Sequence, residues 1–363
     1  MHTMLKINFT INGARCTVED EATTPVVHDD SEEAPMRYIA LEEAFFIPEL
    51  AERQPASDFQ QVFQLLRFKP EYAERYQRRL TDFTEYRLPE MDDAGIEVQV
   101  LSHTAPGLQV QIEPGLAREN ARFVNDYVAK VVSEHPDRFQ GFAALPLQDP
   151  AAAAAELERA VTELGFCGAL VNDCVHGPGG RYLDAPEYDE VWSALESLGV
   201  PLYLHPGAPP ADQWQVLQGR PELYGASWSW AAEVGGHALR IVYSGMFDRH
   251  PGATLILGHM GEFLPFQRSR LDSRYQAIDA ASPLTRPPSA YLGTNVVFTN
   301  SGVFSPATLL GAVLEVGADA VMFSVDYPYE SSYEAVAGFE RTTLSAGDRD
   351  KIAHGNAERL LRV

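Results

Sequence analysis

Histidines and carboxylates stand at the ends of several short apolar runs, where they could together bind a metal ion. His205 ends "PLYLH", His259 follows "TLILG", and Glu42 ends "YIALE". Asp326 ends "AVMFSVD", which has the pattern of a buried strand. A buried carboxylate is costly unless it is paired or bound to a metal. Any one of these residues could simply begin a turn, but their recurrence at equivalent places favours a shared site.

The candidate ligands define the kind of metal. Glu42, His205 and Asp326 offer two carboxylates and one imidazole with no thiolate, a set that suits Mg²⁺, Mn²⁺ or Zn²⁺. Three protein ligands leave coordination positions open for substrate or water, which is typical of catalytic sites. We therefore expect one divalent metal ion, bound by these three residues.

The segment "LGHMGE" places His259 and Glu262 three residues apart across a glycine. The Glu262 carboxylate can then orient the His259 imidazole. If the imidazole also meets Asp326, the three form a carboxylate–imidazole–carboxylate relay that can hold and deliver a proton. The same residues fit a second interpretation, in which the glycines permit a tight turn and Glu262 caps a helix. The sequence leaves both open.

Four further residues are candidates for substrate binding. His103 ends "IEVQVLSH" and Asn172 ends "CGALVN", where each could contact a substrate hydroxyl or hydrogen-bond a neighbouring loop. Trp228, in "SWSWAAE", could form the wall of an aromatic pocket or pack at an interface. Arg249, in "FDRHP", could pair with a substrate carboxylate or form a structural salt bridge.

The elements that must position these residues alternate along the chain. Eight apolar runs fit buried parallel strands: "RYIALEE", "IEVQVLSH", "FQGFAALPL", "CGALVN", "PLYLHP", "TLILGHMGE", "NVVFTN" and "AVMFSVDYP". Helical patterns such as "PAAAAAELERAVTELGF" separate them. This order predicts an α/β fold, a (β/α)8 TIM barrel whose strand ends converge on one rim. A doubly wound open sheet normally carries a glycine-rich phosphate turn after its first strand, and "ALEEAFF" has none.

The first residues differ from the rest. "LKINFTINGARCTVED" alternates apolar and polar residues around Asn12 and Gly13, which predicts a β-hairpin. The acidic, turn-rich "DEATTPVVHDDSEEAP" follows as a linker. We predict an N-terminal hairpin extension over residues 1–36 and a catalytic barrel over residues 37–363.

Charge and composition exclude several classes of partner. The net charge of −23 over 363 residues, with 28 Lys and Arg, argues against nucleic acid and anionic membrane surfaces. The three cysteines show no metal-type spacing, and no apolar run is long enough to cross a bilayer. The start of the chain lacks the pattern of a signal peptide. We expect a cytoplasmic enzyme that acts on a small molecule.

Several longer motifs resemble one enzyme family. They include "ALEEAF", "NDYVAKVVSEHPDRFQGFAALPLQDP", "HALRIVYSGMFDRHPGATLILGHMGE", "TNSGVFS" and "FSVDYPYE". The chain after its N-terminal extension resembles the metal-dependent nonoxidative decarboxylases of the amidohydrolase superfamily, the group of 2,3-dihydroxybenzoate, salicylate and gamma-resorcylate decarboxylases. The resemblance implies that Glu42, His205 and Asp326 bind the metal, and that Asp326, His259 and Glu262 handle the proton. It also implies a homodimer or homotetramer.

One position departs from the family pattern. Many relatives have a further histidine ligand two residues after the first glutamate, where this chain has Ala44. "LEEA" resembles the 2,3-dihydroxybenzoate and salicylate enzymes, whereas "GRYLD" resembles vanillate-type members. The resemblance implies decarboxylation of an ortho-hydroxylated, 2,3-dihydroxybenzoate-like aromatic acid by protonation of the ring carbon and release of CO₂. Two alternatives are a hydrolase of amides or lactones, which would use the same ligands, and a metal-stabilised binding protein without turnover.

Overall fold

The computed structural model describes residues 7–11, 14–18 and 36–363, except 54–65, 112, 177–179, 208–213 and 281–283. The chain forms two compact units, Met1–Pro35 and Met36–Val363. In the first, strands β1 (Ile7–Ile11) and β2 (Ala14–Val18) pair in antiparallel fashion, with Ile11 opposite Ala14. The predicted hairpin strands are therefore present. The predicted turn at Asn12 and Gly13 and the acidic linker lie outside the described residues.

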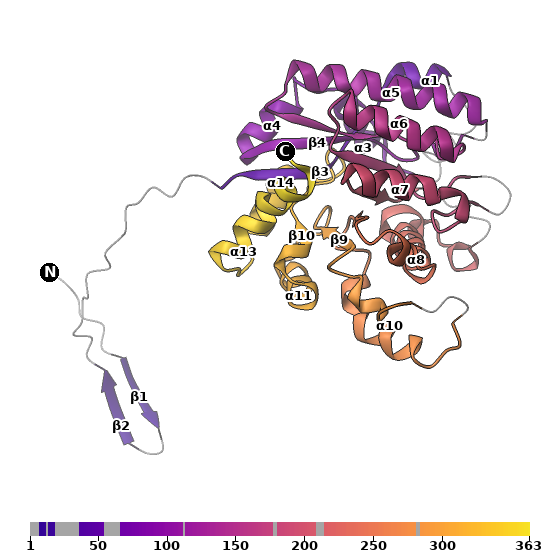
Figure 1. The fold of residues 1–363 in the computed structure, drawn as a ribbon. Helices are drawn as coiled ribbons and strands as arrows, with labels where there is room; N and C mark the ends of the chain where they lie inside the picture. Colours follow the sequence, from indigo (N-terminus) through magenta and orange to yellow (C-terminus); the bar gives the residue numbers. More distant parts are fainter. Residues whose placement is uncertain are drawn as a thin grey trace. The chain divides into compact units, whose positions relative to one another are not determined.

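The second unit is built on eight parallel strands that follow one another in the sheet in sequence order (Figure 1). Each apolar run predicted as a strand forms one of them. Their bounds are β3 (Tyr38–Phe45), β4 (Ile96–His103), β5 (Phe139–Ala143), β6 (Gly168–Asn172), β7 (Leu202–His205), β8 (Leu255–Leu257), β9 (Val296–Thr299) and β10 (Val321–Met322).

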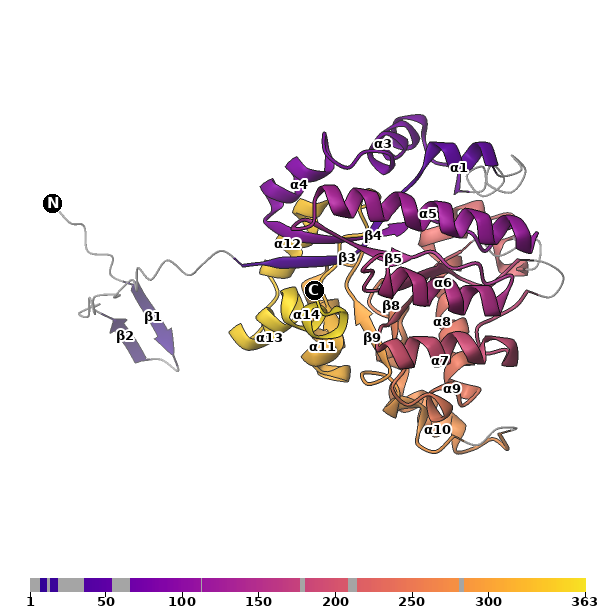
Figure 2. The ribbon, with the colours of Figure 1, turned by 45° about the horizontal axis from the view of Figure 1, so that its top comes forward.

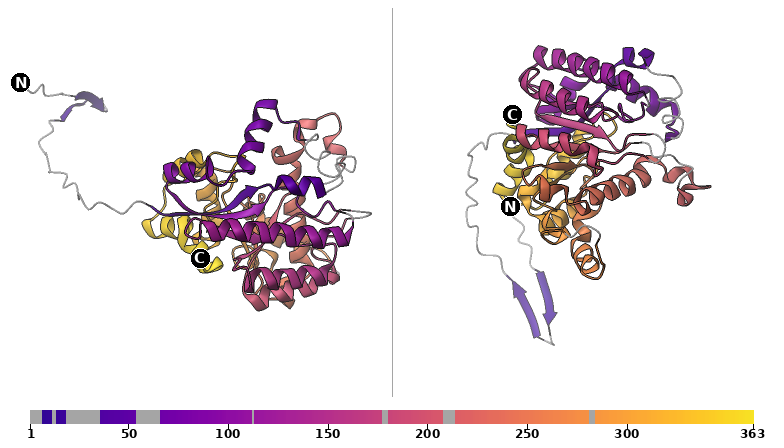
Figure 3. Two further views of the ribbon diagram at one scale, coloured as in Figure 1. Left: turned by 90° about the horizontal axis from the view of Figure 1, so that it is seen from above. Right: turned by 45° about the vertical axis from the view of Figure 1, so that its right-hand side comes forward.

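Helices alternate with the strands and surround them (Figures 2 and 3). They are α1 (Pro48–Arg53), α3 (Pro70–Leu80), α4 (Arg87–Ala94), α5 (Pro114–Glu134), α6 (Pro150–Thr162), α7 (Asp189–Leu198), α8 (Ser229–Tyr243), α9 (Met246–Arg249), α10 (Arg268–Tyr275), α11 (Pro306–Val316), α12 (Ser332–Glu340), α13 (Ala346–Asp350) and α14 (Asn356–Leu361). Helix α6 shows why the sequence folds this way. The Asp149 side chain caps its first turn by accepting from the Ala152 N–H, and Leu157 and Ala160 form its buried face. None of the described helices has the length and apolar character needed to cross a membrane.

Apolar side chains from all eight strands fill the interior of the barrel. They are Ile39, Leu41, Val100, Phe142, Leu170, Tyr203, Ile256, Val297 and Met322. Residues between these positions, such as Leu101 and Val171, belong to the larger apolar cluster that includes buried helix residues such as Leu157. Alternate residues of a strand face opposite sides, so each strand has one interior face and one face toward the helices.

A β-bulge in β3 changes which side chains enter the barrel. Ala40 pairs with Gln99 and Glu43 with Leu101, so three steps along β3 match two along β4. Leu41 packs in the barrel interior, and the next residue, Glu42, also meets an interior side chain, that of Tyr203. Bulges of this kind re-aim side chains beside active sites.

Hydrogen bonds between β3 and the segment that follows β10 nearly close the barrel. The Ala44 N–H donates to the Tyr327 carbonyl at 2.7 Å. The Glu42 N–H donates to Ser324 Oγ at 2.8 Å, and the Val325 N–H donates to the Glu43 carboxylate at 3.0 Å. The structure is therefore the predicted (β/α)8 barrel and not a doubly wound open sheet.

Candidate active site

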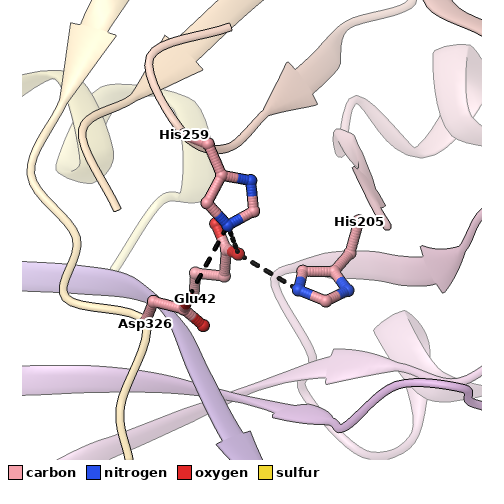
Figure 4. Close-up of side chains that lie close together, drawn as sticks. All are labelled: Glu42, His205, His259 and Asp326. Atoms are coloured by element: carbon pink, nitrogen blue, oxygen red, sulfur yellow. Dashed lines mark ion pairs between the residues drawn. The ribbon is translucent and has the colours of Figure 1, made fainter. Parts of the chain in front are cut away.

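Four side chains converge at the carboxyl-terminal rim of the barrel. Glu42, His205, His259 and Asp326 each offer one ligand atom, and these atoms all lie within 4.8 Å of one another (Figure 4). They come from β3, the end of β7 and the segments that follow β8 and β10. The three predicted ligands are thus brought together, and His259, predicted only for proton handling, joins them.

The two oxygens of the buried Glu42 carboxylate have different surroundings. Oε2 accepts hydrogen bonds from the hydroxyls of Tyr203 and Ser301. Oε1 has no hydrogen-bond partner among the described residues, yet it lies 3.2 Å from Nε2 of both His205 and His259. Burial alone would raise the pKa of Glu42, but the charge of His259 and contacts with both imidazoles hold it well below its usual range.

Asn172 fixes the orientation of His205. Its Oδ1 lies 2.8 Å from His205 Nδ1, which is also 2.9 Å from the carbonyl of Pro206. Two acceptors at Nδ1 require a proton there, so the neutral form of this imidazole has its lone pair at Nε2. The Asn172 amide nitrogen donates to the His103 carbonyl at 3.2 Å. The structure therefore places Asn172 behind a metal-binding candidate, holding the imidazole toward Glu42.

His259 and Glu262 lie in a left-handed turn. Five consecutive residues have positive φ: His259 (49°), Met260 (58°), Gly261 (69°), Glu262 (51°) and Phe263 (68°). This conformation costs roughly 1–2 kcal/mol for each residue with a side chain. It brings Glu262 Oε1 to 2.7 Å from His259 Nδ1. Of the two interpretations left open by the sequence, the geometry supports the carboxylate–imidazole pair.

Asp326 lies on the other side of the same imidazole. Its Oδ2 is 3.7 Å from His259 Nε2, and its φ of 77° is also left-handed. Burial raises the pKa of Asp326, and the charge of Glu42 raises it further, against the opposing effect of His259. Burial lowers the pKa of His259, but Glu42, Glu262 and Asp326 together raise it well above its usual value. The Asp326 carboxyl group and the His259 imidazole are therefore both easier to protonate than the free side chains.

The residues present fit a divalent cation. The orphaned Glu42 Oε1, the free Nε2 of His205 and the Asp326 carboxylate face one another. A buried carboxylate oxygen without a hydrogen-bond donor is costly, and a metal ion would satisfy it. Two carboxylates with imidazole form a donor set of the kind that Mn²⁺, Mg²⁺ and Zn²⁺ accept.

A cavity of about 190 Å³ opens beside the cluster. His205 and Asp326 line it together with Leu66, Phe68, Tyr76, Ala105, Tyr224, Ala226, Ser227, Trp230, Tyr329 and Glu330. This volume is below the range of about 300–1,000 Å³ that is usual for drug-sized ligands. The aromatic lining and the size suit a ligand with a single aromatic ring.

Two predicted substrate-binding residues lie away from this cavity. Trp228 is 43% exposed and packs against Phe263, whereas Trp230, two residues later, lines the cavity. Arg249 forms an ion pair with Asp189 at 3.0 Å and donates to the Ser244 carbonyl. Helix α8 places Trp230 at the cavity, and the Arg249 guanidinium is paired with Asp189. Neither Trp228 nor Arg249 is therefore in a position to contact a ligand in this cavity.

His103 is also turned away from the barrel interior. By strand alternation it shares the face of Leu101, which packs in the cluster toward the helices. Its ring lies 5.8 Å from that of Phe45, and neither nitrogen has a hydrogen-bond partner within the described part of the chain. Burial lowers the pKa of His103 to about 4, so the imidazole is neutral. This position does not suit a contact with substrate.

Replacing His103 with leucine is expected to stabilise the protein. The change removes two unsatisfied buried nitrogens, whose burial costs about 1–3 kcal/mol, and keeps an apolar side chain beside Phe45. Thermal unfolding should show a higher Tm, and kcat/KM should stay within about threefold of the wild-type value. A loss of kcat/KM greater than tenfold would instead place His103 at the substrate.

Comparison with known proteins agrees with this geometry. The chain matches the Amidohydrolase family model over residues 57–363. It is 42% identical over 331 residues to gamma-resorcylate decarboxylase of Rhizobium radiobacter, covering 90% of this chain and 98% of that protein. A crystal structure of 2,6-dihydroxybenzoate decarboxylase complexed with 2,6-dihydroxybenzoate is 41% identical with a TM-score of 0.83, covering 90% of this chain and 100% of the other.

A second solved structure bears on the metal. It is a dihydroxybenzoic acid decarboxylase from Polaromonas sp. with bound manganese and the inhibitor 2-nitroresorcinol, 39% identical with a TM-score of 0.80, covering 90% of this chain and 97% of that chain. This bound manganese, together with the cluster of Glu42, His205, His259 and Asp326, supports one divalent metal ion as the cofactor. The similarity to named decarboxylases argues against the two alternatives, a hydrolase and a binding protein without turnover. The chain belongs to the amidohydrolase superfamily, within which it is a carboxy-lyase that decarboxylates aromatic acids with the help of a divalent metal ion.

Proposed function

We propose that the enzyme decarboxylates an ortho-hydroxylated benzoate, and that 2,6-dihydroxybenzoate is the first candidate substrate. The observation that carries this proposal is a protonatable buried carboxyl group, Asp326, that lines a small aromatic cavity next to a divalent-metal cluster. Similarity to enzymes named for gamma-resorcylate, which is 2,6-dihydroxybenzoate, supports this acid. The 2,3-dihydroxybenzoate expected from "LEEA" stays a prediction.

Direct loss of CO₂ from a benzoate would leave an unstable aryl carbanion. An ortho hydroxyl opens an easier route, because its oxygen can donate electrons into the ring while a proton is added to the carbon that bears the carboxylate. The bond between this carbon and the carboxylate then breaks, its electron pair returns to the ring, and CO₂ leaves. The overall reaction consumes one proton and restores the aromatic ring.

The residues of this chain take distinct roles in that route. We propose Glu42, His205 and Asp326 as the residues that would hold the metal, which would supply Lewis-acid stabilisation of the negative charge on the substrate. Protonated Asp326 delivers the proton to the ring carbon. His259, held by Glu262 at 2.7 Å, connects to Asp326 and can return a proton to it.

The cavity wall orients the ring. Trp230, Phe68, Tyr76 and Tyr329 supply aromatic side chains to its lining, and the rings of Tyr76 and Tyr329 lie 5.0 Å apart. Aromatic side chains favour stacked or edge-on contacts with another ring. Holding the ring in one orientation sets the reacting carbon near Asp326, and this positioning can supply a large part of the rate acceleration.

A reconstitution experiment tests the proposal. Metal-stripped enzyme would be incubated with 2,6-dihydroxybenzoate, 2,3-dihydroxybenzoate and salicylate, with Mg²⁺, Mn²⁺ or Zn²⁺ added back separately, while the acid's ultraviolet band and CO₂ are followed. We expect metal-dependent loss of 2,6-dihydroxybenzoate with one CO₂ per molecule consumed. Lack of turnover of every ortho-hydroxybenzoate by enzyme with metal demonstrably bound would contradict the proposal.

A further inference from the structure

We propose that Ser301 is a positioning residue whose single hydroxyl holds Glu42 and the left-handed turn of His259 and Glu262 in one fixed arrangement. Ser301 does not touch the cavity and acts through these neighbours. The inference deepens the proposed function and rests on it for the role of His259 in proton transfer. The connection between Glu42 and the turn does not depend on the proposed function, because it follows from two hydrogen bonds of the Ser301 hydroxyl.

Ser301 follows β9 and is fully buried. Its Oγ donates to Oε2 of Glu42, a residue of β3, and accepts from the backbone N–H of His259 at 3.0 Å. Glu42 and His259 are distant in sequence, and each contributes to the metal cluster. One side-chain atom therefore connects the carboxylate to the first residue of the left-handed turn.

The neighbouring hydroxyls of Tyr203 and Thr299 fix the direction of the hydrogen bonds that Ser301 makes. Tyr203 also donates to Glu42 Oε2, and Thr299 Oγ1 lies 2.7 Å from Tyr203 OH and 3.2 Å from Ser301 Oγ. A hydroxyl has one proton to donate. Because the protons of Tyr203 and Ser301 go to the carboxylate, Thr299 must donate to one of them. The network is directional, and it points two protons at Oε2 so that Oε1 remains free for the metal.

The tight packing around Gly258 indicates that this arrangement is specific. A Cβ at Gly258 would lie 2.3 Å from Glu42 Oε2, 2.9 Å from Tyr203 OH and 3.0 Å from Ser301 Oγ. The first of these distances is far shorter than any carbon–oxygen contact in folded proteins, and the other two lie at the lower limit of such contacts. The residue before His259 is a glycine because the hydrogen-bond network of Glu42 occupies the space that any other side chain would need.

Loss of the Ser301 hydroxyl would release both connected groups. Glu42 Oε2 would keep only Tyr203 and could rotate, and the partly buried His259 N–H would lose its acceptor. The turn would then rely on two backbone hydrogen bonds, from the Met260 N–H to the Thr299 carbonyl at 2.8 Å and from the Gly261 N–H to the Gly258 carbonyl at 2.7 Å. Because left-handed backbone is unfavourable for residues other than glycine, the turn would relax and the contact between His259 and Glu262 would loosen.

The test compares Ser301→Ala with Ser332→Ala, a fully buried serine whose Oγ has no hydrogen-bond partner in the described structure. Titration of Mn²⁺, followed by the electron paramagnetic resonance signal of the free ion, gives the metal Kd. Proton NMR of the metal-free protein gives the downfield imidazole N–H that bonds to Glu262, assigned by its disappearance in Glu262→Gln. Kinetics at saturating Mn²⁺ separate kcat from KM.

We expect Ser301→Ala to weaken Mn²⁺ binding by about tenfold, in line with other residues that orient ligands. The downfield N–H should shift or vanish, and kcat should fall more than KM changes, while Ser332→Ala keeps wild-type values. Ser301→Cys, with a weaker donor and acceptor, should lie between the two and serves as the test if Ser301→Ala does not fold.

The proposal would be overturned if a folded Ser301→Ala protein kept both the wild-type Mn²⁺ affinity and an unchanged downfield N–H signal. If the alanine variant does not fold, the same result in Ser301→Cys would overturn it. Neither the Mn²⁺ titration nor the NMR spectrum needs a substrate. A failure of the proposed function, in which no ortho-hydroxybenzoate is consumed, can therefore be distinguished from a failure of this inference.

Discussion

Replacing Asp326 with asparagine is expected to reduce turnover by about 10²–10⁴-fold even at saturating metal, the usual contribution of a general acid. Asparagine keeps the size of the side chain and one oxygen for the metal, but it cannot deliver a proton to the ring carbon. Burial and the charge of Glu42 raise the pKa of Asp326, so the wild-type carboxyl group holds a proton more readily than a free aspartate does.

Two measurements separate proton transfer from metal binding in Asp326→Asn. The Mn²⁺ Kd of the variant sets the concentration that saturates its site, and kcat is then measured there. Exchange of the product's ring hydrogen with D₂O, followed by NMR, reports the reverse proton transfer without CO₂. The wild-type enzyme should catalyse this exchange and the variant should not. Recovery of turnover to within tenfold of wild type at saturating Mn²⁺ would show that Asp326 serves only as a ligand.

The barrel could be predicted because each strand has an unambiguous pattern. A strand of a parallel sheet is buried on both faces, so it appears as a short continuous apolar run. The runs around Leu204, Ile256 and Val297 are of this kind, and all eight predicted runs form strands. Much of the site followed from the same pattern, because the carboxyl ends of barrel strands meet at one rim.

The sequence pattern did not show that the two adjacent glutamates, Glu42 and Glu43, point in different directions. Glu42 and Glu43 are adjacent and both fully buried, yet a bulge sends Glu42 into the barrel. Glu43 accepts from the Val325 N–H instead, and burial raises its pKa to about 8 despite the nearby Arg87. A bulge depends on the register between two strands, which a single sequence does not encode in any local signal.

Other parts of the site depend on partners that are distant in sequence. Arg249 pairs with Asp189, and no local pattern distinguishes this from a contact with substrate. Tyr203 and Ser301 have hydroxyls that meet Glu42 only because β3, β7 and the end of β9 converge. Trp230 rather than Trp228 enters the cavity because of where α8 begins, and helix boundaries are the least certain part of a sequence-based prediction.

The loss of metal binding in Glu42→Gln is the second large effect that the structure predicts. Glutamine can still meet the hydroxyls of Tyr203 and Ser301, so the variant should fold. It removes, however, the negative charge at the centre of the cluster, 3.2 Å from Nε2 of both His205 and His259. Residues that only orient a ligand change metal affinity by about 10–100-fold. We therefore expect the Mn²⁺ Kd of Glu42→Gln to rise by at least about 100-fold.

Comparison with Glu262→Gln distinguishes the loss of a metal ligand from the loss of a residue that only orients a neighbouring imidazole. Glu262 contacts His259 Nδ1 and lies outside the metal cluster, so its glutamine variant should weaken Mn²⁺ binding by about tenfold, the lower end of that range, and should mainly lose turnover. Glu42→Gln should also lower the pKa of His259 in the metal-free protein, because the Glu42 charge is a main cause of its elevation. Mn²⁺ titration and NMR titration of the imidazole measure these two quantities. Wild-type Mn²⁺ affinity in Glu42→Gln would exclude Glu42 as a metal ligand. It would also mean that no cation contacts Glu42 Oε1 in the wild-type protein.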